Sequence, residues 1–199
     1  GLVKIDQKPR KFQVINHRNP LIRGLSSYMI SSIWQEENGD LWLGTSGRGL
    51  NHWSRENGEV TYYGSNAGPG RWLIHDQIHT VYRDRSGNLW VGTGDGVNKM
   101  PAGSNQFYRF CDREPHVSCG YFNGQQVNDI LEDSGGKIWF AASNGLHVYD
   151  PESGLIRSHS TIYNGAEMLS LRDVYCVLED HRSWIWVGSS VGLIKILPD

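Results

Sequence analysis

The sequence has few of the features that place a protein in a membrane, on nucleic acid or around a metal ion. No apolar run approaches the roughly 18 residues that span a bilayer. The N-terminal stretch GLVKIDQKPRKF lacks the apolar core of a secretory signal. The net charge of −2 gives no electrostatic reason to expect a nucleic-acid partner. We therefore expect no membrane contact by this segment, no cofactor, and no metal-binding or catalytic residues.

Cysteine is also scarce, with three residues in 199, and their spacing does not match a zinc site. Cys111 and Cys119 share one irregular stretch, whereas Cys176 lies in a strand-like run. A Cys111–Cys119 disulfide would form in an oxidising compartment, but free buried thiols fit the sequence equally well. The sequence leaves the pairing open.

The chain does contain one sequence motif that recurs four times. GDLWLGTSGRGL, GNLWVGTGDGV, GKIWFAASNGL and SWIWVGSSVGL follow one another, with anchor tryptophans 48, 49 and 47 residues apart. An acid stands six residues before each tryptophan, and a glycine follows after six or seven. Four copies that agree at three positions predict a repeat architecture. The tryptophans are Trp42, Trp90, Trp139 and Trp186, the acids are Glu36, Asp84, Asp133 and Asp180, and the glycines are Gly49, Gly96, Gly145 and Gly192.

Each copy reads as four short strands, A to D, joined by tight turns, with almost no helix. In the first copy we predict strands over 30–36, 41–45, 50–54 and 59–63. Strand B of every copy is apolar on both faces, as in Leu41-Trp42-Leu43, so both faces must be covered. Four-stranded sheets stacked around an axis satisfy this, and about 40–50 residues is the usual length of a β-propeller blade. The predicted fold is all-β, about four blades of a larger propeller.

Two repeated positions have structural explanations. A small residue two places after each tryptophan (Gly44, Gly92, Ala141 and Gly188) shares the face of the indole and leaves room for a bulky group of the next blade. The recurring acid can accept amide hydrogens in the turn between strands A and B. Because the acids recur identically, we do not expect them to be catalytic.

These motifs resemble the two-component regulator propeller repeat, whose pattern is roughly V-x-x-I-x-E-D-x-x-G-x-L-W-x-G-T-x-x-G-L-x-x-Y. VYRDRSGNLWVGTGDGVNKM and VNDILEDSGGKIWFAASNGLHVYD meet it, and the resemblance covers essentially the whole chain. It implies the periplasmic sensor of a hybrid two-component regulator of gut Bacteroidetes, which recognises breakdown products of complex carbohydrates and signals to a histidine kinase. In the fourth copy Arg182-Ser183-Trp184 replaces the turn glycine, so the pattern does not predict that A–B turn.

The repeat also divides the chain into blades. We expect 1–29 to end a preceding blade and its connection, 30–77, 78–126 and 127–173 to be blades, and 174–199 to be an incomplete blade. Residues 1–6 then align with strand C and residues 11–15 with strand D. Such a segment of a larger propeller would expose apolar faces at both ends. We expect these faces to meet other copies of the chain or the remainder of the propeller.

Function is expected in the long connections from strand D of one blade to strand A of the next, because their contents differ between copies. These connections are residues 16–29, 64–77, 111–126 and 161–173. Aromatic rings stack on sugar faces, guanidinium and amide groups bind hydroxyls or carboxylates, and the excess of arginine favours an acidic saccharide. The candidate ligand-binding residues are Arg18, Arg71, Trp72, His75, Arg113, His116, Tyr121, Asn123, Tyr163 and Asn164.

These observations predict an extracytoplasmic sensor segment, periplasmic or extracellular, that binds an oligosaccharide released from a complex polysaccharide. Two alternatives remain. A propeller enzyme, a lyase or glycosidase, would need converging catalytic groups, and the connections offer Asp76, Asp112, Glu114 and Glu167 without a recognisable spacing. A scaffold would use its faces only to bind protein or to dimerise. We prefer the sensor and expect no enzymatic activity from this segment.

Overall fold

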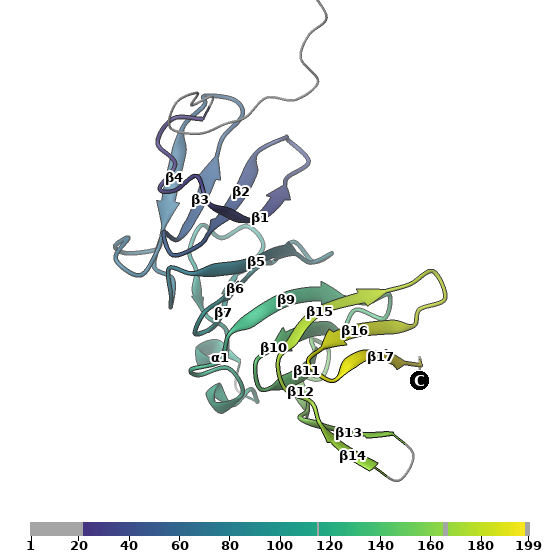
Figure 1. Cartoon of the computed structure of the whole chain (residues 1–199). Helices are drawn as coiled ribbons and strands as arrows, with labels where there is room; N and C mark the ends of the chain where they lie inside the picture. The colour runs from purple at the N-terminus through teal and green to yellow at the C-terminus, as the bar shows by residue number, and fades with distance from the viewer. Residues whose placement is uncertain (1–21, 115, 165–166, 198–199) are drawn as a thin grey trace, which may run out of the picture.

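The computed structural model describes residues 22–114, 116–164 and 167–197 (Figure 1). Its strands form four blade-like antiparallel sheets and one separate hairpin. The sheets are β1 (Ile30–Gln35), β2 (Leu41–Thr45), β3 (Leu50–Trp53) and β4 (Val60–Tyr63); β5 (Ile78–Arg83), β6 (Leu89–Thr93), β7 (Gly96–Met100) and β8 (Tyr108–Arg109); β9 (Val127–Glu132), β10 (Ile138–Ala142), β11 (Gly145–Asp150) and β12 (Leu155–His159); and β15 (Val174–Glu179), β16 (Ile185–Ser189) and β17 (Gly192–Ile196).

The predicted all-β fold with four-stranded blades is confirmed. In the first blade every predicted strand is found, and three of the four are one residue shorter than predicted at one end. Strand A stops before Glu36 because that residue begins the turn, where its backbone N–H donates to the carbonyl of Asp40 at 2.9 Å. The strands expected at 1–6 and 11–15 lie outside the described residues. None of the described helices is long and apolar enough to cross a membrane.

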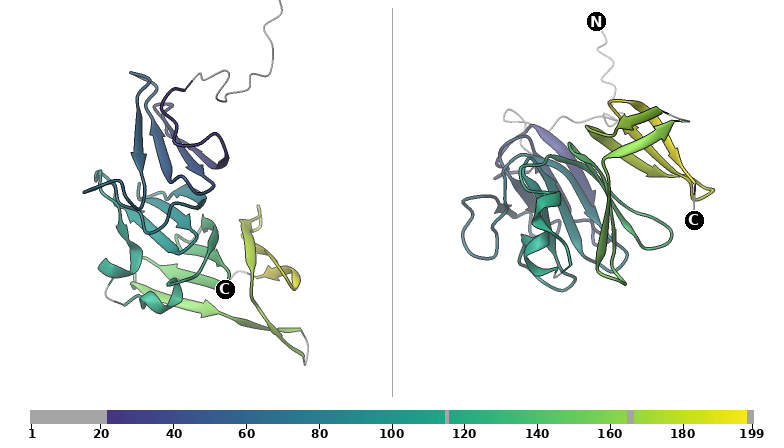
Figure 2. Two further views of the ribbon diagram at one scale, coloured as in Figure 1. Left: turned by 60° about the vertical axis from the view of Figure 1, so that its left-hand side comes forward. Right: turned by 90° about the horizontal axis from the view of Figure 1, so that it is seen from below.

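The sheets are arranged with their A strands side by side (Figures 1 and 2). Close contacts join β1 to β5, β5 to β9 and β9 to β15, whereas no contact of comparable extent joins β4, β8 and β12 within the described part of the chain. The A strands therefore form the inner edge and the D strands form the outer edge. This is the geometry of propeller blades around an axis.

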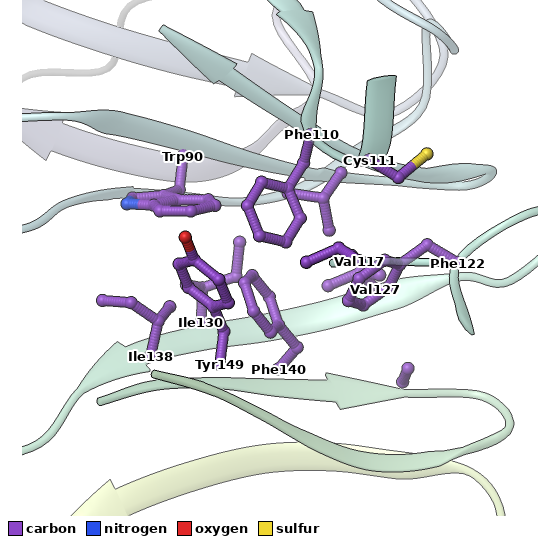
Figure 3. Packing of buried hydrophobic residues seen from close by; sticks show 12 residues of the cluster. Trp90, Phe110, Cys111, Val117, Phe122, Val127, Ile130, Ile138, Phe140 and Tyr149 are labelled. Atoms are coloured by element: carbon purple, nitrogen blue, oxygen red, sulfur yellow. The ribbon is translucent and has the colours of Figure 1, made fainter. Parts of the chain in front are cut away.

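Apolar side chains fill each of the three junctions between successive blades. Figure 3 shows the middle one, where Trp90 and Phe110 of the second blade pack against Phe140 and Tyr149 of the third. Burying one such large side chain contributes about 1.5–3 kcal/mol. The blades therefore depend on one another for their cores.

Hydrogen bonds along the inner edge fix each blade to the next. The Ser32 hydroxyl accepts from the backbone N–H of Val81 at 2.9 Å. One junction further on, the Asp129 carboxylate accepts from the N–H of Val177 at 3.0 Å. Each A strand also has a β-bulge near its start, and the Asn128 side chain at one bulge donates to the carbonyl of Val174 at 2.7 Å. These bonds set the spacing of the sheets.

The last residue of strand A forms a second hydrogen bond between blades, to the A–B turn of the preceding blade. Glu132 accepts from the N–H of Arg85 at 2.6 Å, and Glu179 accepts from the N–H of Ser134 at 2.7 Å. In the second blade the same position is Arg83, which donates to Glu36. The residue at this position is therefore a cation in the second blade and an anion in the third and fourth, but in each case it bonds to the A–B turn of the preceding blade.

The small residue after each anchor tryptophan has the packing role predicted for it where a next blade follows closely. A methyl group added to Gly44 would lie 2.7 Å from Ile78, and one added to Gly92 would lie 2.7 Å from the carbonyl of Val127. Both neighbours belong to the next blade. A side chain at these positions would push the blades apart.

The A–B turn of the fourth blade forms although it lacks the glycine of the other three. The glycines Gly39, Gly87 and Gly136 have φ of +88°, +85° and +85°, and Ser183 takes the same left-handed conformation with φ of +58°. Its N–H donates to the carbonyl of Asp180 at 2.9 Å, as the glycines do to their own acids. The turn is kept at the cost of strain in one serine.

The connections after the second and third blades also contain regular structure. Residues 161–173 were expected to be irregular, but Thr161–Asn164 (β13) and Glu167–Ser170 (β14) form a hairpin that extends away from the blades (Figure 2). In the connection before the third blade, α1 (Phe110–Arg113) and η1 (Cys119–Tyr121) are joined by a Cys111–Cys119 disulfide. The pairing that the sequence left open is therefore formed.

We predict that Ser183→Gly raises the free energy of unfolding by roughly 0.5–1 kcal/mol, because glycine takes the left-handed conformation without strain. Urea denaturation measures the change. Ser86→Gly is the matched control, since this exposed turn serine has no positive φ and its replacement should lower stability slightly. A loss of stability in Ser183→Gly equal to that in the control would contradict the prediction.

Candidate functional site

The strongest repeated chemistry in the structure is a hydrogen bond from each anchor indole to the acid six residues before it. The four Nε1 to carboxylate distances lie between 2.7 and 2.8 Å. Because the acceptor is charged, each bond contributes about 1.5–3 kcal/mol where it is buried. The pairs are Trp42–Glu36, Trp90–Asp84, Trp139–Asp133 and Trp186–Asp180.

The carboxylates of Asp84, Asp133 and Asp180 also accept amide hydrogens of the A–B turns, as the sequence predicted, whereas in the first blade Asn38 and not Glu36 accepts from the turn. Asp84 accepts from the N–H of Asn88 at 2.7 Å, and Asp133 accepts from the N–H of Lys137 at 2.9 Å. In the exposed fourth blade, the indole of Trp186 is the main group that holds the pKa of Asp180 below its ordinary value. The bonds that these acids accept come from their own blade or, for Glu36, also from Arg83 of the next blade, which indicates a structural role.

The candidate ligand residues of the second connection point to different places. Arg71 is exposed and lines a cavity of 350 Å³ with Asn105 and Gln106, which belong to the C–D turn of the second blade. Trp72 is exposed beside it. His75 packs against Gly94 in a B–C turn, and its Nδ1 accepts from the N–H of Gln77 at 3.0 Å.

The third connection is similarly divided. The Arg113 guanidinium lies 4.6 Å from the ring centre of Tyr108, and exposed His116 lies near Gly154 in the C–D turn of the third blade. Tyr121 faces the third blade instead, with its ring 5.7 Å from that of His147. Asn123 is exposed on the same stretch.

The remaining candidates do not join these groups. Tyr163 is 74% exposed on the hairpin, opposite Met168. Asn164 ends β13, and Arg18 lies outside the described residues. The structure therefore spreads the candidates over B–C turns, the outer rim and the hairpin. Their role in ligand binding stays a prediction.

Two of the carboxylates considered for catalysis are engaged in the protein. Asp76 accepts from the hydroxyl and the N–H of Ser65 at 2.6 and 2.8 Å, and these bonds lower its pKa although burial opposes them. Glu114 accepts from Lys99 at 3.0 Å and from the Tyr149 hydroxyl at 3.1 Å. Asp112 lies beside the disulfide sulfurs, which are bonded to each other and so are not free to ligate a metal.

The largest of the described cavities lies on the other face, between the A–B turns of the first two blades. This first cleft has a volume of 830 Å³ and is lined by Trp34, Asp40, His52 and Arg85 among others. The equivalent clefts at the next two junctions, which contain Lys99 and Glu179 respectively, measure 270 and 240 Å³. One junction of the three is therefore open.

One position distinguishes the first cleft from the second. His52, Lys99, Val148 and Lys195 each pair with the anchor tryptophan across strands B and C. In the second cleft the Lys99 ammonium lies 4.8 Å from the ring centre of Trp90 and reaches Glu114, so its long side chain fills the space. The shorter His52 stacks on Trp42, with ring centres 4.3 Å apart, and leaves the first cleft open.

The lining of the first cleft combines aromatic faces with polar groups. Burial is the main cause that lowers the pKa of His52, and nearby Asp40, 3.5 Å from its Nε2, opposes that shift. The Nε1–H of half-buried Trp34 is inaccessible to solvent and has no hydrogen-bond partner among the described residues. An unpaired buried donor costs about 1–3 kcal/mol. Sequence analysis missed these residues because the cleft depends on cross-strand register.

The comparisons with known proteins agree with this architecture. Residues 73–95, which include β5 and β6, match the family model described as two component regulator propeller. The chain is 29% identical over 162 residues to a histidine kinase of Formosa agariphila, covering 81% of this chain and 12% of that protein. It therefore spans about an eighth of this curated relative.

Solved structures show the same likeness. The extracellular domain assigned to the hybrid two-component system BT3049 of B. thetaiotaomicron has a TM-score of 0.70 and 25% identity, covering 93% of this chain and 24% of that one. The domain assigned to BT4673 of the same organism has a TM-score of 0.55 and 17% identity, covering 83% of this chain and 26% of that one. This second likeness concerns the fold alone.

We predict that Asp84→Asn lowers the free energy of unfolding by about 2 kcal/mol, because it removes the charge that accepts from buried Trp90. Chemical denaturation measures the loss. Glu56→Gln makes the same chemical change on an exposed turn and should have little effect. A loss in Glu56→Gln as large as that in Asp84→Asn would show that the indole bond is not the cause.

We also predict that stability falls as the pH is lowered from about 6.5 to about 4, because burial lowers the pKa of His147 to about 4. The unfolded chain binds a proton in this range and the folded chain does not, so acid favours unfolding by up to about 3 kcal/mol.

Unfolding curves across this pH range test the idea with His147→Gln. The variant should flatten the dependence without abolishing it, because burial lowers the pKa of His52 and His79 in the same direction. Exposed His181→Gln should keep the slope of the parent chain. A slope in His147→Gln as steep as that of the parent would refute the assignment.

Proposed function

We propose that this chain, which carries the two-component regulator propeller repeat, is part of the extracytoplasmic ligand sensor of a two-component signalling protein. The likeness to the extracellular domain of the BT3049 system supports the location, and the relative in Formosa agariphila supports coupling to a histidine kinase. The disulfide fits a compartment that is oxidising. The blades supply the rigid frame of the sensor.

The ligand is an oligosaccharide, bound in the first cleft. The observation that supports this proposal is the 830 Å³ volume beside Trp34 and His52, because aromatic faces with polar neighbours suit sugar rings. Trp34 and His52 supply the aromatic rings of the lining, beside the carboxylates of Glu36 and Asp40. Carboxylates outnumber arginines in the lining, which favours a neutral saccharide over the acidic one expected from the loop arginines.

Binding is measured by tryptophan fluorescence and calorimetry with a panel of neutral and uronic-acid oligosaccharides. We expect a neutral member to bind. His52→Lys should abolish its binding, because a lysine at this position fills the equivalent cleft of the next junction. Trp34→Ala should weaken it by about tenfold, since one aromatic ring of the lining is removed.

Arg71→Ala and Arg113→Ala are controls on the long connections and should leave affinity unchanged. Loss of binding in these variants, with His52→Lys unaffected, would move the site to the connections. Failure of every panel member to bind would reject saccharide recognition by this chain. Release of shorter sugars during the titrations would favour the enzyme alternative.

A further inference from the structure

The first cleft carries negative charge that the protein does not neutralise fully. Four acids and two arginines line it. Both arginines are already paired, since Arg83 donates to Glu36 at 3.0 Å and Arg85 forms an ion pair with Glu132 of the third blade at 3.0 Å. Asp40 forms no ion pair with a lysine or an arginine within the described part of the chain. Its charge therefore faces the cleft without a cation of the protein beside it.

The Asp40 carboxylate is fixed in the lining of this cleft. Its Oδ1 accepts from the backbone N–H of Arg55 at 2.8 Å, and its Oδ2 accepts from the Asn38 side chain at 3.0 Å. The bond from Arg55 is the main cause that lowers the pKa of Asp40, so the carboxylate is charged at neutral pH. His52 lies 3.5 Å from it and is neutral under these conditions, because burial lowers the pKa of the imidazole.

The fold does not require the charge of Asp40. Asn88 stands at the equivalent position of the second blade, two residues before the anchor tryptophan, and its side-chain oxygen accepts from the N–H of Ala102 at 3.2 Å. Arg55 and Ala102 occupy the same place in their C–D turns, since each follows the last residue of strand C by two positions. An amide thus makes the bond that the carboxylate makes in the first blade. The negative charge of Asp40 is left to act in the cleft.

The second junction shows how a cation is held in the equivalent cleft. The Lys99 ammonium lies 4.8 Å from the ring centre of Trp90 and donates to Glu114 at 3.0 Å. An indole face and a carboxylate therefore bind one primary ammonium together. The first cleft offers the same two kinds of group, the ring of Trp34 and the carboxylate of Asp40, around its open volume.

We propose that the saccharide bound in the first cleft is an amino sugar with a free ammonium group. This inference rests on the proposed function, since it names the chemical class of the ligand of the same site. Asp40 accepts hydrogen bonds from the ammonium, and exposed Glu37 adds to the negative potential of the lining. A neutral saccharide would cover the Asp40 carboxylate, whose side chain is already only 13% exposed, without supplying a cation.

Calorimetry with two trisaccharides of the same backbone tests the proposal. One is made of glucosamine units with free amines, and the other is its fully N-acetylated form. At a pH at which the amines are protonated, the free-amine form should bind at least about tenfold more tightly. This preference should shrink as the salt concentration rises, because salt screens the attraction between charges.

Two variants remove the charges that carry the preference. Asp40→Asn should bring the ratio of the two affinities close to one, and Asn88 shows that an asparagine at this position keeps the structural bond to the C–D turn. Glu37→Gln, at an exposed position of the lining, should lower the ratio by a smaller factor. Glu56→Gln is the matched control, since it removes a charge of the same blade outside the cleft and should keep the ratio of the parent chain.

The outcomes separate this inference from the proposed function. If the N-acetylated form binds as tightly as the free-amine form, the amino-sugar assignment is wrong and saccharide recognition stands. If neither form binds and no other saccharide does, both proposals fail. An unchanged ratio in Asp40→Asn would overturn the role of that carboxylate. Spermidine, which carries amines without a sugar ring, should bind more weakly than the free-amine trisaccharide, and equal affinity would overturn the assignment to a sugar.

Discussion

The hydrogen bond from an indole to a carboxylate six residues earlier is the interaction on which each blade depends. In the second blade it joins the end of strand A, at Asp84, to the centre of strand B, at Trp90. The same carboxylate accepts from the turn amide of Asn88, so one charge fixes both the turn and the tryptophan ring. The ring then fills the junction with the next blade. Local geometry and packing between blades are therefore set by one pair of residues.

The fold could be predicted well because its signals are local and repeated. Strand B over Leu41–Thr45 was predicted to the residue, since an apolar strand between two turns has clear limits. The turn role of the acids followed from their position before the turn. The indole bond was not predicted, because the apolar neighbours of each anchor tryptophan indicate packing, and a hydrogen bond of its ring nitrogen leaves no pattern in the sequence. The hairpin was not predicted, because strands of only four residues are too short to show a clear period in the sequence.

The candidate site was much less predictable. Residues of the long connections were chosen by chemical type, and the folded connections carry them to separate places: Arg71 to the outer rim and Tyr121 onto the third blade. His52 lines the first cleft, and Lys99 has the equivalent position in the second blade. That difference has meaning only once the residue opposite each tryptophan is known. A single sequence gives the repeat, but the register across strands has to come from the structure.

Within the described residues, the hydrogen bonds between blades join successive blades, as in Ser32 to Val81 and Asp129 to Val177. Contacts that reach no further than one blade leave the unit free to be copied or removed as a whole by recombination between repeats. A duplicated blade would pack against the same kind of apolar face on both of its sides. The architecture thus accommodates gene-level changes in blade number, while substitutions such as histidine for lysine diversify one junction at a time.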